Sequence, residues 1–363
     1  MEQKMNGLSR DLIIHPGETL YEILEDREMT QKELAVRSGV TEKHVSTIIK
    51  GLKPISVAYA KKLEYALGID ASFWINLQAN YDKELLEFEE VNNISPNEIK
   101  ILKNLKSIIE YLINIKLMNS DNNEAVKVLD LRRLLGVSNL TSISSITYNA
   151  AYRAQVASKA DIYVLFAWQM ICDILTENIQ LSDGFDTNKL KDKIPDIKQL
   201  MFARADVIQK ELKEIFAECG IAFKIVRHFT GAPVQGFIKG NEQGRTILCM
   251  TIRGGFADRF WFTLFHEIAH VLNGDAKQKF IDFDSAENEI EERANKFARN
   301  TLLSPIEYKK FLQHNDFSLR ATKDFAERQG VRPFVVIGRL QNECKLEWGK
   351  YSYEMVTYRW ASE

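Results

Sequence analysis

The sequence predicts a protein of more than one domain: an all-α domain in residues 1–80, a helical connector in residues 81–185, and an α+β domain with a small antiparallel sheet in residues 186–363. Three observations support this division. The chain has 363 residues, which is more than a single hydrophobic core usually serves. Apolar residues recur at helical spacing through the first half of the chain. From about residue 186, strand-like runs separated by glycine and proline appear between the helical segments.

The composition is that of an ordinary globular protein, with 45% hydrophobic and 27% charged residues. A formal net charge of −2 gives no general attraction to nucleic acid, so any contact with DNA requires a local basic patch. The four cysteines lie far apart with no CxxC pair, which suits a reducing cytoplasm and argues against a thiolate metal site. The N-terminal residues contain no signal-peptide pattern, and the most apolar segment, Ile162–Leu175, is too short to span a bilayer. We therefore expect a soluble cytoplasmic protein without a membrane partner.

Residues 1–80 are expected to form short helices joined by tight turns. The expected helices are Glu18–Arg27, Thr30–Arg37, Thr41–Lys50 and Ser56–Leu67. Thr30, followed three residues later by Glu33, has the pattern of a capping box, and Gly68 is placed to end the fourth helix.

The stretch TQKELAVRSGVTEKHVSTIIKG, Thr30–Gly51, has the pattern of a helix-turn-helix. Leu34 and Ala35 are placed on the inner face of the first helix, and Gly39 at a turn that needs a positive φ. Apolar residues of the second helix, such as Val45, pack it against the first at a steep angle. The second helix is then able to enter the major groove of DNA. The alternative is a plain helical bundle with a solvated polar face.

The residues expected to contact DNA lie at the starts of the two helices and along the outer face of the second. They are Gln31, Thr41, Glu42, Lys43, His44, Thr47 and Lys50. Gln31 and Lys50 are placed to reach phosphates, whereas the outward residues of the second helix are placed at the groove. A carboxylate at Glu42 repels phosphate but can accept a hydrogen bond from cytosine, so the sequence leaves the operator open.

The run from His15 to Tyr81 resembles the HigA-type branch of the XRE helix-turn-helix family. The resemblance is carried by HPGE at its start, TQKELA in the first helix of the motif, the glycine turn, and FWINLQANY at its end. It implies an antitoxin or autorepressor that binds palindromic double-stranded operator DNA as a homodimer and has a toxin as a partner. Glu42 and the modest basicity around it depart from the family pattern.

A small sheet is expected after the connector. The connector itself has a clear helix start at Ser95-Pro96-Asn97-Glu98 but no residues that suggest chemistry. The strand-like runs are Ile221–Phe229, Val234–Lys239 and Thr246–Ile252. Because short turns join the three runs, the sequence favours an antiparallel arrangement.

The run His266-Glu267-Ile268-Ala269-His270 predicts a metal site on a helix. Residues i and i+4 lie on one helix face, so both imidazoles can bind one Zn²⁺ with bonds of about 2.0–2.1 Å. Glu267 is then placed near the open coordination position and can act as a general base on water. The alternative is a partly buried helix that carries two ordinary polar residues. Two of the six histidines at this spacing, with a glutamate between them, favour the metal site.

A third protein ligand is expected from the helix predicted in ENEIEERANKFARNTLLSP, Glu287–Pro305. Glu291 is the favoured ligand, because the spacing Glu-x-x-x-Asn places Asn295 on the same side, where it can hydrogen-bond a ligand histidine. Glu287 and Glu292 are the alternative ligands. The candidates for stabilising an oxyanion, none of them assigned, are His228, Arg253 and Tyr308.

The second half of the chain, roughly Lys189–Tyr351, resembles the ImmA/IrrE metallopeptidase family. The resemblance is carried by RFWFTLFHEIAHVLNGD, EERANKFARNTLLSP and FAERQGVRPFVVIGRLQ. It implies a zincin-like peptidase domain with one Zn²⁺ per chain, three ligands (His266, His270 and Glu291) and Glu267 as the general base. Active members resemble endopeptidases that cut a helix-turn-helix repressor and so derepress its genes. Arg293 is a departure, at a position where the family often has a glutamate.

Together these motifs predict a DNA-binding transcriptional regulator fused to a zinc endopeptidase that cleaves a repressor protein, either itself or a partner. Two alternatives stay open. In the first, the chain is a HigA-like antitoxin and autorepressor whose peptidase fold only binds a toxin or senses a ligand. In the second, DNA binding has been lost, and the first domain captures a homologous repressor by dimerising with it.

Overall fold

The computed structural model describes residues 10–148, 161–182, 184–240, 245–275 and 286–360. The chain divides into two compact units: Met1–Lys103 with Ile115–Arg133, and Asn104–Asn114 with Leu134–Glu363. The predicted connector, residues 81–185, is thus shared between the two units. None of the helices in the described ranges combines the length and the apolar content that crossing a membrane requires.

The first unit begins with the helices predicted from the sequence. They are α1 (Pro16–Asp26), α2 (Gln31–Ser38), α3 (Glu42–Ile49) and α4 (Val57–Leu67), and they are followed by α5 (Ala71–Asn92). The expected N-cap at Thr30 is confirmed, because its hydroxyl accepts from the Glu33 amide at 3.1 Å, and Gly68 ends α4 with φ of 67°. The Glu33 carboxylate pairs with Arg37 at 2.6 Å, so it does not complete the predicted capping box. The turn glycine Gly39 has φ of 61°, as the motif requires.

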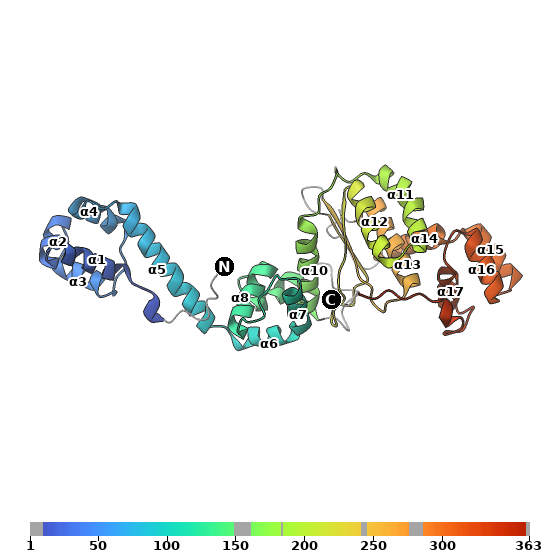
Figure 1. The fold of residues 1–363 in the computed structure, drawn as a ribbon, viewed down its shortest axis with the longest axis horizontal. Coiled ribbons are helices and arrows are strands. Elements are labelled where there is room, and N and C mark those ends of the chain that lie inside the picture. Colours follow the sequence, from blue (N-terminus) through green and yellow to red (C-terminus); the bar gives the residue numbers. More distant parts are fainter. Residues whose placement is uncertain (1–9, 149–160, 183, 241–244, 276–285, 361–363) are drawn as a thin grey trace. The chain divides into compact units, whose positions relative to one another are not determined.

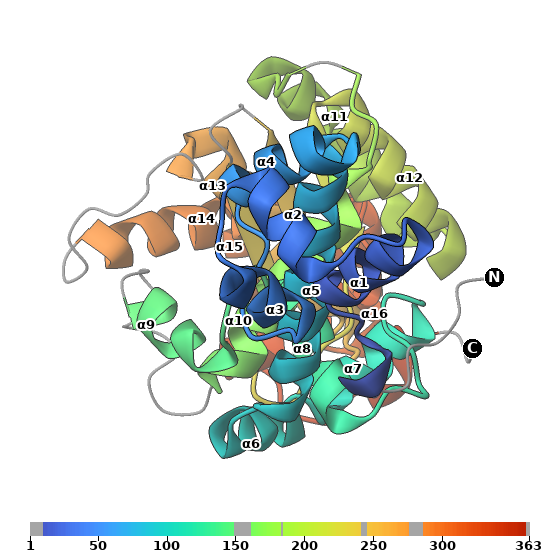
Figure 2. The same cartoon turned by 90° about the vertical axis from the view of Figure 1, so that its left-hand side faces the viewer.

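Helices α1 to α4 gather around the N-terminal end of α5 (Figures 1 and 2). Their apolar faces meet in one core, to which α5 contributes Trp74. The fully buried members of that core are Leu20, Leu34, Val45, Ile48, Ala60, Leu63 and Trp74. Because α1 packs on α3, α4 packs on α2, and α2 and α3 pack on each other, the two helices of the motif have a fixed mutual angle.

The HPGE stretch closes this core at the start of α1. The His15 ring caps the helix, because its Nδ1 accepts from the Gly17 amide at 2.9 Å, and it packs on Tyr81 in a T-shaped arrangement with ring centroids 4.7 Å apart. At Gly17 the backbones of α1 and α3 touch: a Cβ there would lie 2.0 Å from the carbonyl oxygen of Ile48. Only glycine permits this approach, so the tetrapeptide has a structural role.

A buried ion pair ties α6 (Pro96–Asn104) to α8 (Glu124–Leu135) in the same unit. The Glu98 carboxylate has 1% of its side chain exposed and accepts two bonds from the Arg132 guanidinium, at 2.9 and 2.7 Å. Glu98 also belongs to the helix start predicted at Ser95, whose hydroxyl donates to the carboxylate at 3.2 Å. The fork geometry makes this pair one of the stronger kinds of ionic contact.

Replacing Arg132 with methionine is expected to destabilise the first unit by about 3–5 kcal/mol, because the buried Glu98 carboxylate loses its guanidinium partner. Urea unfolding followed by circular dichroism measures the change. Arg133 is the matched control, since its side chain is 74% exposed and its loss should cost below about 1 kcal/mol. An Arg132→Met protein as stable as the wild type would contradict this account. A Glu98→Leu/Arg132→Met double variant should recover most of the loss.

The second unit surrounds a three-stranded sheet with helices. Before the sheet lie α7 (Lys106–Asn114), α9 (Ile143–Tyr148), α10 (Ile162–Glu177), α11 (Thr187–Gln199) and α12 (Ala205–Glu218). The strands are β1 (Ile221–Ile225), β2 (Gly236–Gly240) and β3 (Thr246–Met250). After them come α13 (Ala257–Asn273), α14 (Ala286–Leu302), α15 (Pro305–His314), α16 (Leu319–Arg328) and α17 (Pro333–Asn342).

The prediction of an antiparallel sheet is wrong, because the sheet is mixed. Its strand order is β1-β3-β2, with β3 antiparallel to β2 but parallel to β1. The connection from residue 226 to residue 235 leads from β1 to β2 without pairing the two strands, and β3 lies between them. All five residues of β3 are buried, as befits a central strand. In the described parts of the chain, β1 and β2 are therefore the edge strands.

Helices cover both faces of this sheet. Figure 1 shows α10 on one side of the strands and α12 and α13 on the other. The apolar helix α10 packs on β1 and β3, and its Trp168 donates to the Arg227 carbonyl at 3.1 Å. Helix α13 packs on β2 and α14, which brings the HEIAH run next to an edge strand.

Candidate functional site

Helix α13 holds the predicted metal motif rigidly. Its apolar residues, among them Trp261, Leu264 and Phe265, are fully buried in the core of the second unit. The helix ends at Gly274, whose φ of 77° lets its amide donate back to the His270 and Val271 carbonyls. The histidine face of the helix is therefore fixed by burial on its other sides and by a defined C-terminal stop.

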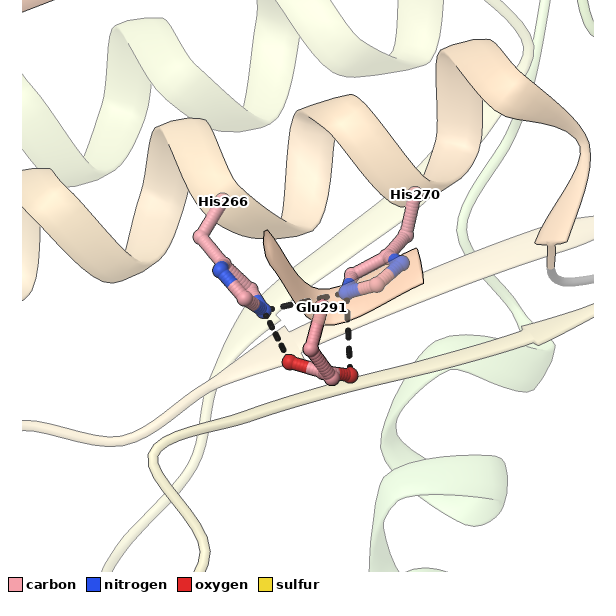
Figure 3. Close-up of side chains that lie close together, drawn as sticks. All are labelled: His266, His270 and Glu291. Carbon is pink, nitrogen blue, oxygen red and sulfur yellow. Dashed lines mark hydrogen bonds and ion pairs between the residues drawn. The ribbon is translucent and has the colours of Figure 1, made fainter. Parts of the chain in front are cut away.

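The structure brings His266, His270 and Glu291 together, with one ligand atom from each lying within 4.8 Å of the others (Figure 3). The two Nε2 atoms are 3.0 Å apart. Glu291, from α14, places its carboxylate oxygens 3.1 Å from Nε2 of His266 and 3.4 Å from Nε2 of His270. In Figure 3 all three side chains point toward one another.

The chemistry and spacing of these donors fit zinc. Bonds of about 2.0–2.1 Å in a tetrahedral site imply ligand separations of about 3.3 Å, close to the observed distances. Hydrogen bonds from both histidines lower the pKa of Glu291 to about 2. Burial alone would lower the pKa of His270, but hydrogen bonds to Glu291 and Asp275 raise it to about 9. The cluster therefore favours a positive charge at its centre, which a divalent cation also supplies.

Each histidine is also held through its second ring nitrogen. Nδ1 of His266 lies 3.0 Å from Oδ1 of Asn295, the residue predicted to orient it. Nδ1 of His270 lies 2.9 Å from Oδ2 of Asp275. Such partners fix the ring orientation and leave Nε2 free to coordinate. The other oxygen of Asp275 accepts from Arg293 at 3.1 Å, so this departure from the family pattern supports the site.

Asp275 is a site residue that the sequence reasoning missed. It directly follows Gly274, and the left-handed turn folds the chain back beneath the end of the helix. An acidic residue just after the C-terminal glycine of a HExxH helix was the available signal. Of the alternative ligands, Glu292 is engaged with Arg299 instead, and the side chain of Glu287 lies outside the described residues.

The side chain of Glu267 extends from α13 toward strand β2. A Cβ built at Gly236 would be 2.3 Å from Oε1 of Glu267, so the carboxylate sits against the strand backbone where a side chain would otherwise be. Burial raises the pKa of Glu267, and the two neighbouring histidines partly offset that effect. Next to Gly236, Gln235 accepts from the Thr263 hydroxyl at 3.0 Å and ties the strand to the helix. The carboxylate therefore has a defined position beside the three donors.

The three residues considered as oxyanion donors, His228, Arg253 and Tyr308, do not gather at the metal-binding cluster. The Tyr308 hydroxyl donates to Glu343 at 2.9 Å, and burial raises the pKa of this tyrosine. His228 and Arg253 instead line a separate cavity with Arg227 and Trp360. No oxyanion donor is therefore assigned.

In the first unit, the outer face of the helix-turn-helix is polar. Thr41, Glu42, Lys43 and Lys50 are exposed, whereas the other three predicted contact residues are partly buried. Those three are Gln31, His44 and Thr47. The exposed lysines lie at both ends of α3, where a phosphate backbone would pass on either side of an inserted helix.

Several of the predicted contact residues also have roles within the motif itself. The Thr41 hydroxyl caps α3 by accepting from the His44 amide at 3.2 Å. The His44 ring packs edge-on against Tyr59, with centroids 5.0 Å apart, and the Thr47 hydroxyl donates to the His44 carbonyl at 2.8 Å. Thr41 and His44 thus help to form α3, the helix that presents Lys43 and Lys50 to solvent.

Comparisons with known proteins match the first unit. The helix-turn-helix family HTH_3 matches residues 20–74. A protein assigned as an antidote of a plasmid maintenance system from Nostoc punctiforme PCC 73102 is 32% identical, over 23% of this chain and 97% of its own, with a TM-score of 0.20. An addiction module antidote protein of the HigA family from Coxiella burnetii is 28% identical, over 23% of this chain and 96% of its own, with a TM-score of 0.21.

The Pseudomonas aeruginosa antitoxin HigA, solved with the higBA promoter, is 30% identical, over 23% of this chain and 96% of its own, with a TM-score of 0.21. No curated protein matches the chain. The chain therefore carries a helix-turn-helix domain in residues 20–74 and, in its second unit, the cluster of two histidines and a glutamate.

Proposed function

We propose that this chain is a DNA-binding transcriptional regulator fused to a zinc-dependent endopeptidase of the zincin-like, ImmA/IrrE type. The convergence of His266, His270 and Glu291, with Glu267 beside them, is the observation that carries the enzymatic part. Zinc held by these donors supplies a Lewis acid that polarises a carbonyl group and acidifies water. Glu267 accepts the proton of the attacking water and passes it to the leaving amine.

The neighbouring edge strand suits a peptide substrate. Within the described residues, strand β2 pairs with β3 alone, and Glu267 lies against its residue Gly236. An extended peptide that adds to this edge forms main-chain hydrogen bonds and brings its carbonyl groups past the three donors. We expect the substrate to be a helix-turn-helix repressor, either this chain or a partner, as the resemblance to the family implies.

The direct test is to incubate the zinc-loaded protein with candidate helix-turn-helix repressors and with itself, and to identify fragments by mass spectrometry. We expect fragments that disappear with a chelator and return when zinc is added back. Fragments that persist with chelator present would assign the cleavage to a contaminant. No fragments from any candidate, with zinc bound, would favour the alternative in which the fold only binds a toxin or senses a ligand.

Replacing Gly236 with alanine is expected to lower cleavage by about 100-fold, because the new methyl group displaces the Glu267 carboxylate from its position. Zinc content should stay at the wild-type level, since none of the three donors is touched. Gly184→Ala is the matched control, because nothing lies within 4 Å of its Cβ position. The quantities to measure are the initial cleavage rate and the zinc content. Equal rates for Gly236→Ala and wild type would contradict the assigned place of Glu267.

For the first unit, we propose that α3 enters the major groove of a double-stranded operator, with the chain bound as a homodimer. The family match and the exposed Lys43 and Lys50 support this part. Binding of labelled upstream DNA should weaken steeply as salt is raised, because phosphate contacts release counterions. A Lys43→Ala/Lys50→Ala variant should show a shallower salt slope. An absence of binding to any upstream DNA would favour a domain that captures a homologous repressor instead.

A second candidate function keeps the same DNA contacts but has no catalysis. In it the chain is an antitoxin-type autorepressor, as the resemblance of His15–Tyr81 implies, and its second unit binds a toxin. One equivalent of zinc without cleavage, together with a stable complex with the product of an adjacent reading frame, would favour this candidate.

A further inference from the structure

A second cavity in the α+β unit has a different chemistry from the metal cluster. It has a volume of about 440 Å³ and shares no residue with the cluster. Three segments form it: the loop after β1, the residues before α13, and the C-terminal stretch. We call it the arginine pocket; its lining residues are Arg227, His228, Ile252, Arg253, Gly254, Gly255, Thr357, Tyr358, Arg359 and Trp360.

Three arginines give the arginine pocket a positive charge. Among the described residues, no carboxylate lies within ion-pair distance of Arg227, Arg253 or Arg359, all of which are exposed. Arg253 uses one nitrogen to donate to the Pro233 carbonyl at 3.0 Å, which steadies its side chain. Burial lowers the pKa of His228, and the nearby Arg253 lowers it further. Within the part of the chain that the structure describes, an anion would therefore meet three cationic side chains that are not paired with a carboxylate.

Two aromatic residues, Tyr358 and Trp360, line the pocket together with these arginines. Trp360 is 45% exposed although it lines the cavity. The Tyr358 hydroxyl is fixed by the Trp261 indole N–H, which donates to it at 2.9 Å. Tyr358 also donates its amide to the Gly255 carbonyl, and Ala257 donates to the Val356 carbonyl, so the C-terminal stretch pairs with the chain just ahead of α13. The exposed indole therefore stands on a well-anchored segment.

The backbone of the cavity is shaped by two glycines. Gly254 and Gly255 have φ of 74° and 72°, and a Cβ on Gly255 would lie 3.0 Å from the Tyr358 carbonyl oxygen. This double turn opens the space in front of the arginines. The cavity volume of about 440 Å³ falls within the range of about 300–1,000 Å³ that is usual for small-molecule sites.

We propose that the arginine pocket binds a nucleoside phosphate. The guanidinium groups bind phosphate oxygens, for which their planar donor geometry is suited. The Trp360 ring stacks on the base, as aromatic side chains do in sites that bind nucleobases. The pocket is lined by both the C-terminal stretch and the residues just before α13, so a bound ligand contacts the two paired segments together.

Calorimetric titration of the full chain with ATP, GTP, adenosine and inorganic pyrophosphate tests the proposal without any use of cleavage. We expect at least one nucleotide to bind more tightly than adenosine and pyrophosphate. Arg253→Gln should weaken binding of that nucleotide by about tenfold or more, since a hydrogen bond to a charged group is lost. Trp360→Ala should weaken it by at least about fivefold but leave pyrophosphate binding unchanged.

Arg320→Gln is the matched control and should bind like the wild type, because its side chain is 92% exposed on α16. Circular dichroism confirms that each variant is folded. No nucleotide binding at millimolar concentration would overturn the proposal. It would also be overturned if pyrophosphate bound as tightly as the nucleotides and Trp360→Ala had no effect, which would indicate a plain polyphosphate site. Loss of duplex DNA binding in Arg253→Gln, without any nucleotide binding, would assign the surface to nucleic acid instead.

Discussion

Replacing Glu267 with glutamine is expected to slow peptide cleavage by about 10³-fold, because an amide cannot accept the proton of the attacking water. The change preserves size, so the side chain still fits against Gly236, where a Cβ would be 2.3 Å from the carboxylate oxygen. None of the three metal donors is altered, so zinc binding should persist. The loss of rate with retained zinc separates a proton-transfer role from a structural one.

The measurement compares the initial rates of fragment formation for wild type and Glu267→Gln at equal zinc content. Glu292→Gln is the matched control: this carboxylate lies on α14 next to the ligand Glu291 but is engaged with Arg299 and should keep wild-type activity. If Glu267→Gln cleaves at the wild-type rate, the base is another group. If both variants lose activity equally, the loss reflects the removal of negative charge near the site rather than the role of the Glu267 carboxylate.

Replacing Gly17 with alanine is expected to destabilise the helix-turn-helix domain by about 3 kcal/mol, because the new Cβ would meet the backbone of α3 and neither helix can yield without disturbing the core. In the structure that Cβ would lie 2.0 Å from the Ile48 carbonyl oxygen. Each kcal/mol shifts the melting temperature of a domain of this size by roughly 4–8 °C, so the melting temperature should fall by more than about 10 °C. Affinity for operator DNA should fall with it.

Gly39→Ala separates the effect of the close contact between α1 and α3 at Gly17 from the effect of placing alanine at a positive φ. Gly39 has φ of 61°, but nothing lies within 4 Å of its Cβ position. Its replacement should therefore cost only about 1–2 kcal/mol, the usual penalty for a left-handed residue. Thermal melting and DNA binding of both variants provide the comparison. The packing of α1 on α3 would be contradicted if the Gly17→Ala protein melted at the wild-type temperature. It would also be contradicted if the melting temperature fell no further in Gly17→Ala than in Gly39→Ala.

The features that could be predicted from the sequence are those set by local geometry. The caps at Thr30, Thr41 and Ser56 use hydrogen bonds to amides three residues away, so short patterns suffice to place the helices of the first unit. His266 and His270 share a face because of helical spacing alone, and their proximity was predictable for the same reason. The contact of Glu291 with these two histidines could not be derived from helical spacing, since it depends on how α14 packs on α13.

The features that escaped prediction depend on long-range packing. The sheet is mixed because the loop between β1 and β2 leaves space for β3, and nothing in the loop sequence fixes that choice. Asp275 reaches His270 through a left-handed turn at Gly274, which becomes visible only once the helix end is known. The arginine pocket joins residues from about position 227 and position 360, which no local pattern relates. The burial of Glu267 against Gly236 has the same origin.

The metal content of the purified chain tests the central claim most directly. Elemental analysis after equilibration with zinc and removal of the excess should give one zinc per wild-type chain. The His266→Ala protein should give close to none, because only His270 and Glu291 remain of the donor set. Wild-type protein without zinc, or His266→Ala protein with a full equivalent, would contradict the assignment of this cluster as a metal centre.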